Sequence, residues 1–112
     1  MNKNPSLYLG HILEAVKKIS RYTSGIDEEE FLENELVKDG VTCNIQIIGE
    51  AIKNLPPEFK EKHPEVPWKD IAGMRDRIVH FYFGIDYQIM WATVKEDIPE
   101  LQQQIKKLLK GQ

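Results

Sequence analysis

The chain has 112 residues, which leaves room for one compact core, and we expect a single domain spanning residues 1–112. Cys43 is its only cysteine, so a disulfide framework or a thiolate zinc site within one chain is excluded. The formal net charge of -3 argues against an indiscriminate nucleic-acid binder. No apolar run approaches the roughly 20 residues that cross a bilayer, and the first residues hold no apolar signal region, so we expect a cytoplasmic protein.

The charge is unevenly distributed along the chain. The stretch from Ile26 to Asp39 holds seven acidic residues and one base, Lys38, and without it the chain is mildly basic. A basic body with one acidic stretch is compatible with RNA binding on a chosen face. A solvated helix face is the plainer interpretation of the acidic stretch itself, and charge alone leaves both open.

Apolar residues recur at helical spacing through the first half of the chain. A first helix is predicted over residues 6–22, with Ser6 as its N-cap and a stop at Ser24-Gly25. A second helical region is predicted over residues 27–55, with a bend near Asn34. Gly49 lies inside this region, where glycine is unfavourable, and so indicates close approach of another helix.

Prolines divide the second half. Pro56-Pro57 ends the second region, residues 57–62 can form one short turn, and Pro67-Trp68 opens a helix whose inward residues are Ile71, Met74 and Ile78. After a break at residues 84–86, a last helix begins near Asp86 or Tyr87, and Pro99 should bend it or mark a restart with Asp97 as cap. No segment alternates convincingly with a period of two. We predict an all-α fold, an antiparallel bundle of four to five helices.

One segment carries residues that a bundle does not require. It places Arg75 five residues before His80 and seven before Tyr82. On an ideal helix Arg75 and Tyr82 share a face, whereas His80 is turned by about 140° from Arg75. Either the helix loosens near Phe81, or the pair meets across a cleft between two copies of the chain, and we therefore predict a symmetric dimer.

The pair suits RNA cleavage without a metal or cofactor. Arg75 can hold a phosphate with its planar guanidinium, and His80 can exchange a proton near neutral pH. A 2'-hydroxyl would attack the adjacent phosphate, with His80 as general acid or base. The plainer interpretation is a histidine in contact with a helix dipole and an arginine at the surface. Arg77 is also close to His80 in sequence and could be the phosphate clamp instead.

Two acidic residues are possible supporting groups. Asp76 could orient His80 or Arg75, although simple solvation is the plainer alternative. Glu50 could be a buried partner for a motif arginine or an ordinary exposed glutamate. Trp68 and Trp91 are expected in the core rather than as base-stacking platforms.

The chain resembles the HepT-like toxins of the HEPN superfamily, whose motif is Arg-x4-His-x-Tyr. Arg75, His80 and Tyr82 match that motif, and the similarity extends over nearly the whole chain. Further matching stretches are Ile47-Ile-Gly-Glu-Ala51, Pro67-Trp68, Gly73-Met-Arg75 and Val94-x-x-Asp-Ile-Pro-x-Leu101. The resemblance implies an all-helical, usually dimeric endoribonuclease, the toxin of a type II toxin–antitoxin system, with Arg75 and His80 as the catalytic pair.

The resemblance also implies a partner. In the HepT-like branch this is an MntA-like nucleotidyltransferase antitoxin, which transfers AMP from ATP onto the motif tyrosine, here Tyr82. The competing hypothesis is a non-catalytic helical module that binds nucleotides or a partner protein, and the third is a plain dimerisation bundle. An intact Arg–His pair favours the enzyme.

Overall fold

The fold is described from a computed structural model, which covers residues 4–80 and 84–112. The elements, in chain order, are α1 (Pro5–Thr23), α2 (Glu28–Glu33), α3 (Glu35–Asn54), α4 (Pro57–Lys62), α5 (Trp68–Ala72), α6 (Met74–Ile78), β1 (Val79–His80), β2 (Gly84–Ile85) and α7 (Tyr87–Lys110). Helices dominate the described residues, so the predicted all-α class is confirmed.

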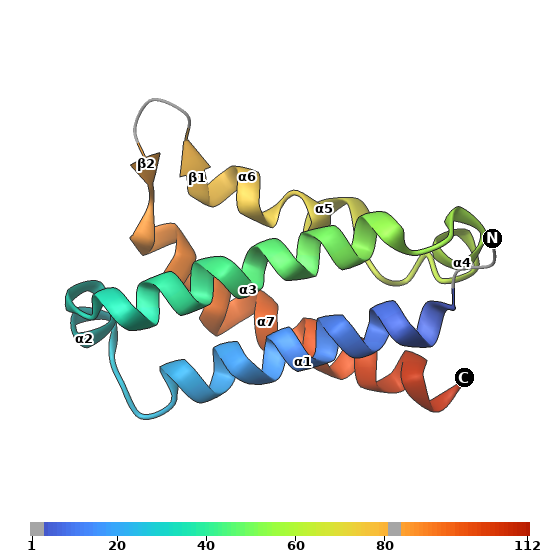
Figure 1. The fold of residues 1–112 in the computed structure, drawn as a ribbon, viewed down its shortest axis with the longest axis horizontal. Coiled ribbons are helices and arrows are strands. Elements are labelled where there is room, and N and C mark those ends of the chain that lie inside the picture. The colour runs from blue at the N-terminus through green and yellow to red at the C-terminus, as the bar shows by residue number, and fades with distance from the viewer. Residues whose placement is uncertain (1–3, 81–83) are drawn as a thin grey trace.

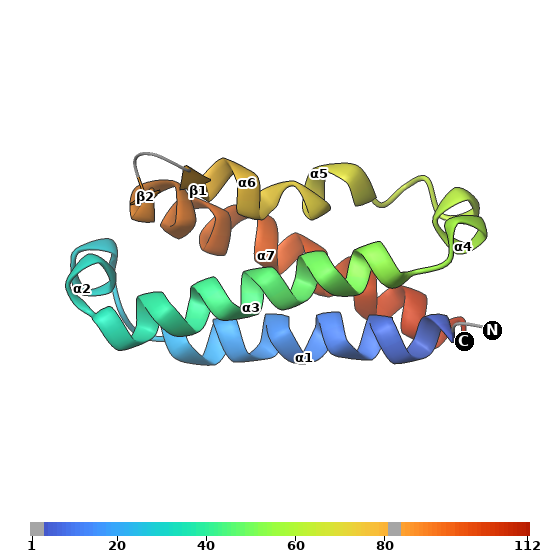
Figure 2. The same ribbon diagram turned by 45° about the horizontal axis from the view of Figure 1, so that its top comes forward.

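Three long helices and one broken helix run alternately up and down. Helices α1 and α3 lie side by side and antiparallel. Helix α7 packs against α1 and passes behind α3 in the view of Figure 1. Helices α5 and α6 follow each other in one line along α3, antiparallel to it, and α6 also contacts α7 (Figure 2). This is the predicted antiparallel bundle, with α5 and α6 together in the place of one helix.

The core lies between these helices. Each long helix contributes a stripe of buried aliphatic residues at three- and four-residue steps, as the sequence periodicity predicted. Fully buried members include Ile12 and Ile19 of α1, Ile48 and Ile52 of α3, and Ile98 and Ile105 of α7. Trp68 is buried, as expected, and Trp91 is half-buried against Phe31 with a ring-centroid distance of 5.1 Å.

The first helix starts slightly earlier than predicted. Its N-cap is Asn4, not Ser6: the Asn4 side chain accepts a hydrogen bond from the Ser6 backbone N–H at 3.0 Å, and Pro5 occupies the first turn. The predicted stop is confirmed, because Ser24 is extended and Gly25 adopts a φ of 76°.

The predicted bend at Asn34 is instead a complete break between α2 and α3. Asn34 is extended, with φ -100° and ψ 95°, and its side chain accepts a hydrogen bond from Val37 N–H at 3.0 Å to cap α3. Helix α2 has its own capping box, made by Asp27 and Glu30. Two complete sets of caps make two helices more favourable than one bent helix.

Two predictions for the second half are also corrected. The helix that opens after Pro67 is interrupted at Gly73 and ends at Ile78, and a short hairpin follows in which Val79 pairs with Ile85 and His80 with Gly84. Helix α7 starts after Asp86, whose side chain caps Ile89 N–H at 3.0 Å, and it passes through Pro99 without a restart at Asp97. Buried residues on both sides of Pro99, including Ile98 and Leu101, hold the helix there despite the missing N–H.

Candidate functional site

Helix α6 carries the first residue of the motif, and packing decides which way it faces. Met74 and Ile78 lie one turn apart and are almost completely buried, so they form the inner side of this five-residue helix. Arg75 is turned by about 100° from Met74 and is exposed at the surface. The same local sequence therefore supplies both a core anchor and an accessible guanidinium.

Arg75 lies in a polar groove between α3 and the α5–α6 line. The described residues that line it are Gln46, Gly49, Glu50, Lys53, Ala72, Arg75 and Asp76. Gly49 of α3 lies beside α5, and a Cβ placed there would lie 3.8 Å from the Ala72 carbonyl oxygen, an ordinary van der Waals distance. Another helix does pass Gly49, as predicted, but not so closely that glycine is required there.

The two predicted supporting acids both lie in this groove. Asp76 pairs with Arg75 itself, with 3.5 Å between Oδ1 and Nη1, so it can orient the guanidinium. Glu50 is exposed rather than buried and pairs with Lys53 at 3.8 Å. Since Arg75 and Asp76 are both solvated, their ion pair holds the arginine loosely and leaves it free to exchange the carboxylate for a phosphate.

His80 does not lie on the helix that carries Arg75. Helix α6 ends at Ile78, where the chain becomes extended at Val79, so the helix stops earlier than the loosening expected near Phe81. Asp86 N–H donates to the Ile78 carbonyl at 2.7 Å, and His80 is exposed on β1. The 140° offset of an ideal helix therefore does not apply to His80. Tyr82 lies outside the described residues.

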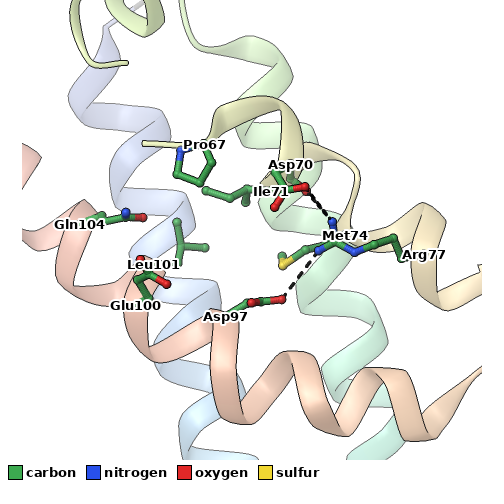
Figure 3. A pocket seen from close by; sticks show the side chains of 9 residues that line it. All are labelled: Pro67, Asp70, Ile71, Met74, Arg77, Asp97, Glu100, Leu101 and Gln104. Carbon is green, nitrogen blue, oxygen red and sulfur yellow. Dashed lines mark hydrogen bonds and ion pairs between the residues drawn. The ribbon is translucent and has the colours of Figure 1, made fainter. Parts of the chain in front are cut away.

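Arg77 is turned by about 200° from Arg75 along α6 and lines a different pocket. Figure 3 shows Arg77 in that pocket with Asp70 and Asp97. Its Nη1 donates to Asp70 Oδ1 at 3.1 Å and to the Asp70 carbonyl at 3.4 Å, and its Nη2 lies 3.7 Å from Asp97 Oδ2. The guanidinium is thus already held by two carboxylates, from α5 and α7. These ion pairs were not predicted from the sequence. Asp70 stands seven residues before Arg77, a two-turn spacing that could have indicated the first pair, whereas nothing local indicates Asp97.

Metal-binding clusters and membrane-spanning helices are both absent from the described parts of the chain. No group of three or more His, Cys, Asp or Glu side chains there could hold a metal ion. Within the same residues, no helix is both long and apolar enough to cross a membrane.

Comparison with known proteins places the chain in a family. The family profile described as "Ribonuclease HepT-like" matches residues 12–108, which include Arg75, His80 and every helix from α2 to α6. The chain belongs to the HepT-like family. The resemblance inferred from the motif and its surrounding stretches is thereby confirmed.

This HepT-like chain has curated relatives that match it over almost its full length. It is 47% identical over 107 residues to a protein of Caldanaerobacter subterraneus named "Putative RNase", with 96% of each chain covered. It is 44% identical over 110 residues to the "Probable ribonuclease HepT" of Thermococcus cleftensis, covering 98% of this chain and 100% of the other. It also matches, at 46% identity, 49% of a "Gamma-glutamylcyclotransferase and putative RNase" of Methanocaldococcus jannaschii. No solved structure gives a significant match.

Proposed function

We propose that this HepT-like chain is a metal-independent endoribonuclease, the toxin of a type II toxin–antitoxin system, with Arg75 and His80 as its catalytic residues. The observation that carries the proposal is an accessible guanidinium on α6 followed, two residues after that helix ends, by an exposed imidazole on β1. Family membership and the ribonuclease names of its relatives support the same activity. A non-catalytic module would not require both groups.

The proposed reaction is transfer of the phosphodiester onto the neighbouring 2'-hydroxyl. The 2'-oxygen forms a bond to phosphorus, the bond from phosphorus to the 5'-oxygen breaks, and the products are a 2',3'-cyclic phosphate and a 5'-hydroxyl. His80 takes the proton of the 2'-hydroxyl or returns one to the leaving oxygen, a role worth roughly 10²- to 10⁴-fold in rate. Arg75 binds the phosphate oxygens and offsets the charge that develops on them.

The test is cleavage of a labelled RNA by variants at the two positions. Arg75→Ala and His80→Ala should each lose at least about 100-fold in rate, because each removes one transition-state interaction. Arg21→Ala and His11→Ala are matched controls, since they remove the same side-chain types from exposed positions on α1. All four should keep the far-ultraviolet circular dichroism of the parent. Full activity in Arg75→Ala or His80→Ala would overturn the assignment.

The same assay tests the chemistry. Activity should survive excess EDTA, because the proposed steps use only protein side chains, and 2'-deoxy substrates should not be cut because they lack the nucleophile. Cleavage of DNA, or loss of activity with EDTA, would point to a different reaction.

We further propose that two copies of the chain form one groove and that an MntA-like nucleotidyltransferase antitoxin neutralises the toxin by transferring AMP to Tyr82. The physical argument is electrostatic and steric. A phosphate on Tyr82, two residues after His80, would compete with RNA for the Arg75 guanidinium, and the adenosine would fill space that RNA needs.

A further inference from the structure

We infer that Arg77 is a positioning residue: its ion pairs with Asp70 and Asp97 hold α6 in place and so set the position of Arg75 and of the chain leading to His80. This inference rests on the proposed function and adds to it a residue that the chemistry itself does not use. It also replaces the alternative in which Arg77 is the phosphate clamp.

Helix α6 needs an external support. It has only five residues, Gly73 at its start makes no side-chain cap, and the chain turns extended at Val79 directly after its end. So short a helix is not stable by itself in water. Burial of Met74 and Ile78 fixes its inner side, and the hydrogen bond from Asp86 N–H to the Ile78 carbonyl fixes its end, but neither contact joins its exposed side to another helix.

Arg77 supplies the missing lateral contact. It lies on α6 and reaches both Asp70 on α5, before the break at Gly73, and Asp97 on α7 (Figure 3). Two of its nitrogens are used, Nη1 for Asp70 and Nη2 for Asp97, in the forked geometry that only a guanidinium provides. The contact therefore joins three helical segments at one point.

The surroundings of Arg77 are unsuited to RNA. Its pocket is lined by three acidic residues, Asp70, Asp97 and Glu100, whose negative charge would repel a phosphate. Arg75 is turned by about 200° from Arg77 along the helix and lines the other groove. The two arginines of the motif segment thus have separate tasks, one toward substrate and one toward the scaffold.

The ion pairs of Arg77 with Asp70 and Asp97, called the Arg77 clamp below, should matter more for the position of α6 than for the overall stability of the protein. The three side chains are 42%, 70% and 49% exposed for Arg77, Asp70 and Asp97, and ion pairs at such exposure add little to global stability. Catalysis is far more sensitive, because a misplacement of about 1 Å can cost on the order of 100-fold in rate. We therefore expect loss of the clamp to impair turnover in a folded protein.

The experiment compares RNA cleavage and RNA binding in Arg77→Gln. We expect kcat to fall about tenfold while the Kd for RNA and its dependence on salt stay as in the parent, and the melting temperature to change by only a few degrees. Arg77→Lys should recover part of the loss, because one ammonium can meet one carboxylate but not both in forked geometry. Arg77→Gln combined with Asp97→Asn should lose no more than Arg77→Gln alone, since the two share one interaction.

Glu100→Gln is the matched control for the acidic side of the clamp. It removes the same charge from the same pocket, one turn after Asp97 on α7, but outside the ion pairs that hold Arg77. It should cleave like the parent. An unchanged kcat in Arg77→Gln would overturn the inference. So would weaker RNA binding with a salt dependence reduced by about one ion, since that is the behaviour of a phosphate contact.

Hydrogen exchange separates failure of this inference from failure of the proposed function. If the parent cleaves no RNA, the proposed function fails, but Arg77→Gln should still speed amide exchange in residues 74–80 and leave the interiors of α1 and α3 unchanged. Unchanged amide exchange in residues 74–80 would then overturn the inference that Arg77 holds α6, whatever the result for RNA cleavage.

Discussion

Arg75 and His80 are close in sequence but stand on different kinds of backbone. Arg75 points from a helix into a groove that it shares with Asp76, whereas His80 follows the extended residue Val79 and pairs with Gly84 of β2. Their relative position depends on the end of α6 and not on helical periodicity. A residue that fixes that end can therefore change the reaction without touching RNA.

At the scale of a single residue, Tyr82 provides the test of regulation. In Tyr82→Phe the hydroxyl that would accept AMP is gone, whereas Arg75 and His80 are retained. We expect the variant to arrest growth when expressed alone and to resist neutralisation by a co-expressed cognate nucleotidyltransferase. Mass spectrometry of the parent Tyr82 peptide should show an added adenylyl group only when both proteins are present. Neutralisation of Tyr82→Phe, without any adenylyl mass shift in the parent, would contradict the proposal.

At the scale of elements, the helices were predictable and their interruptions were not. The buried stripes of α1, α3 and α7 appear in the sequence as apolar steps of three and four residues. The break at Asn34 depends on local capping, in which the Asn34 backbone N–H closes α2 on the Phe31 carbonyl and the Asn34 side chain caps the start of α3. The break at Gly73 carries no comparable cap, and it separates α5, anchored by Trp68, from α6, anchored by Met74 and Ile78.

The α1–α3 contact offers a prediction at this scale. A Cβ added at Gly40 on α3 would lie 3.0 Å from two ring carbons of Tyr22 on α1, whereas one added at Gly10 on α1 would meet no atom within 4 Å. Both glycines lie inside helices, where alanine is favoured by about 1 kcal/mol. Gly10→Ala should raise the melting temperature, and Gly40→Ala should lower it because the Tyr22 ring must move.

Thermal unfolding followed by circular dichroism measures both variants under the same conditions. An equal rise for Gly10→Ala and Gly40→Ala would mean that the tyrosine ring moves aside without cost. The tight packing ascribed to this point of the helix pair would then be wrong.

At the scale of the whole molecule, the proposed groove between two copies predicts complementation. Arg75→Ala and His80→Ala proteins, each inactive alone, should form mixed dimers when unfolded and refolded together. A mixed dimer retains one Arg75 and one His80 in the shared groove, so part of the parent's RNA cleavage should return. Each variant refolded alone is the control, and light scattering should give the mass of two chains. A monomeric mass, or no recovered activity in the mixture, would contradict a shared groove.

The family, the helical class, most of the core and the candidate residues Arg75, His80 and Tyr82 follow from the sequence alone. The periodicity of apolar residues indicates which side of a helix is buried, and a short motif can be recognised in the sequence whatever backbone structure its residues adopt. Only the tertiary structure placed Arg75 in the groove with Asp76, ended α6 before His80, and brought Asp97 of α7 to Arg77. The physical reason is that these features depend on contacts between segments distant along the chain, and a spacing rule describes one segment at a time.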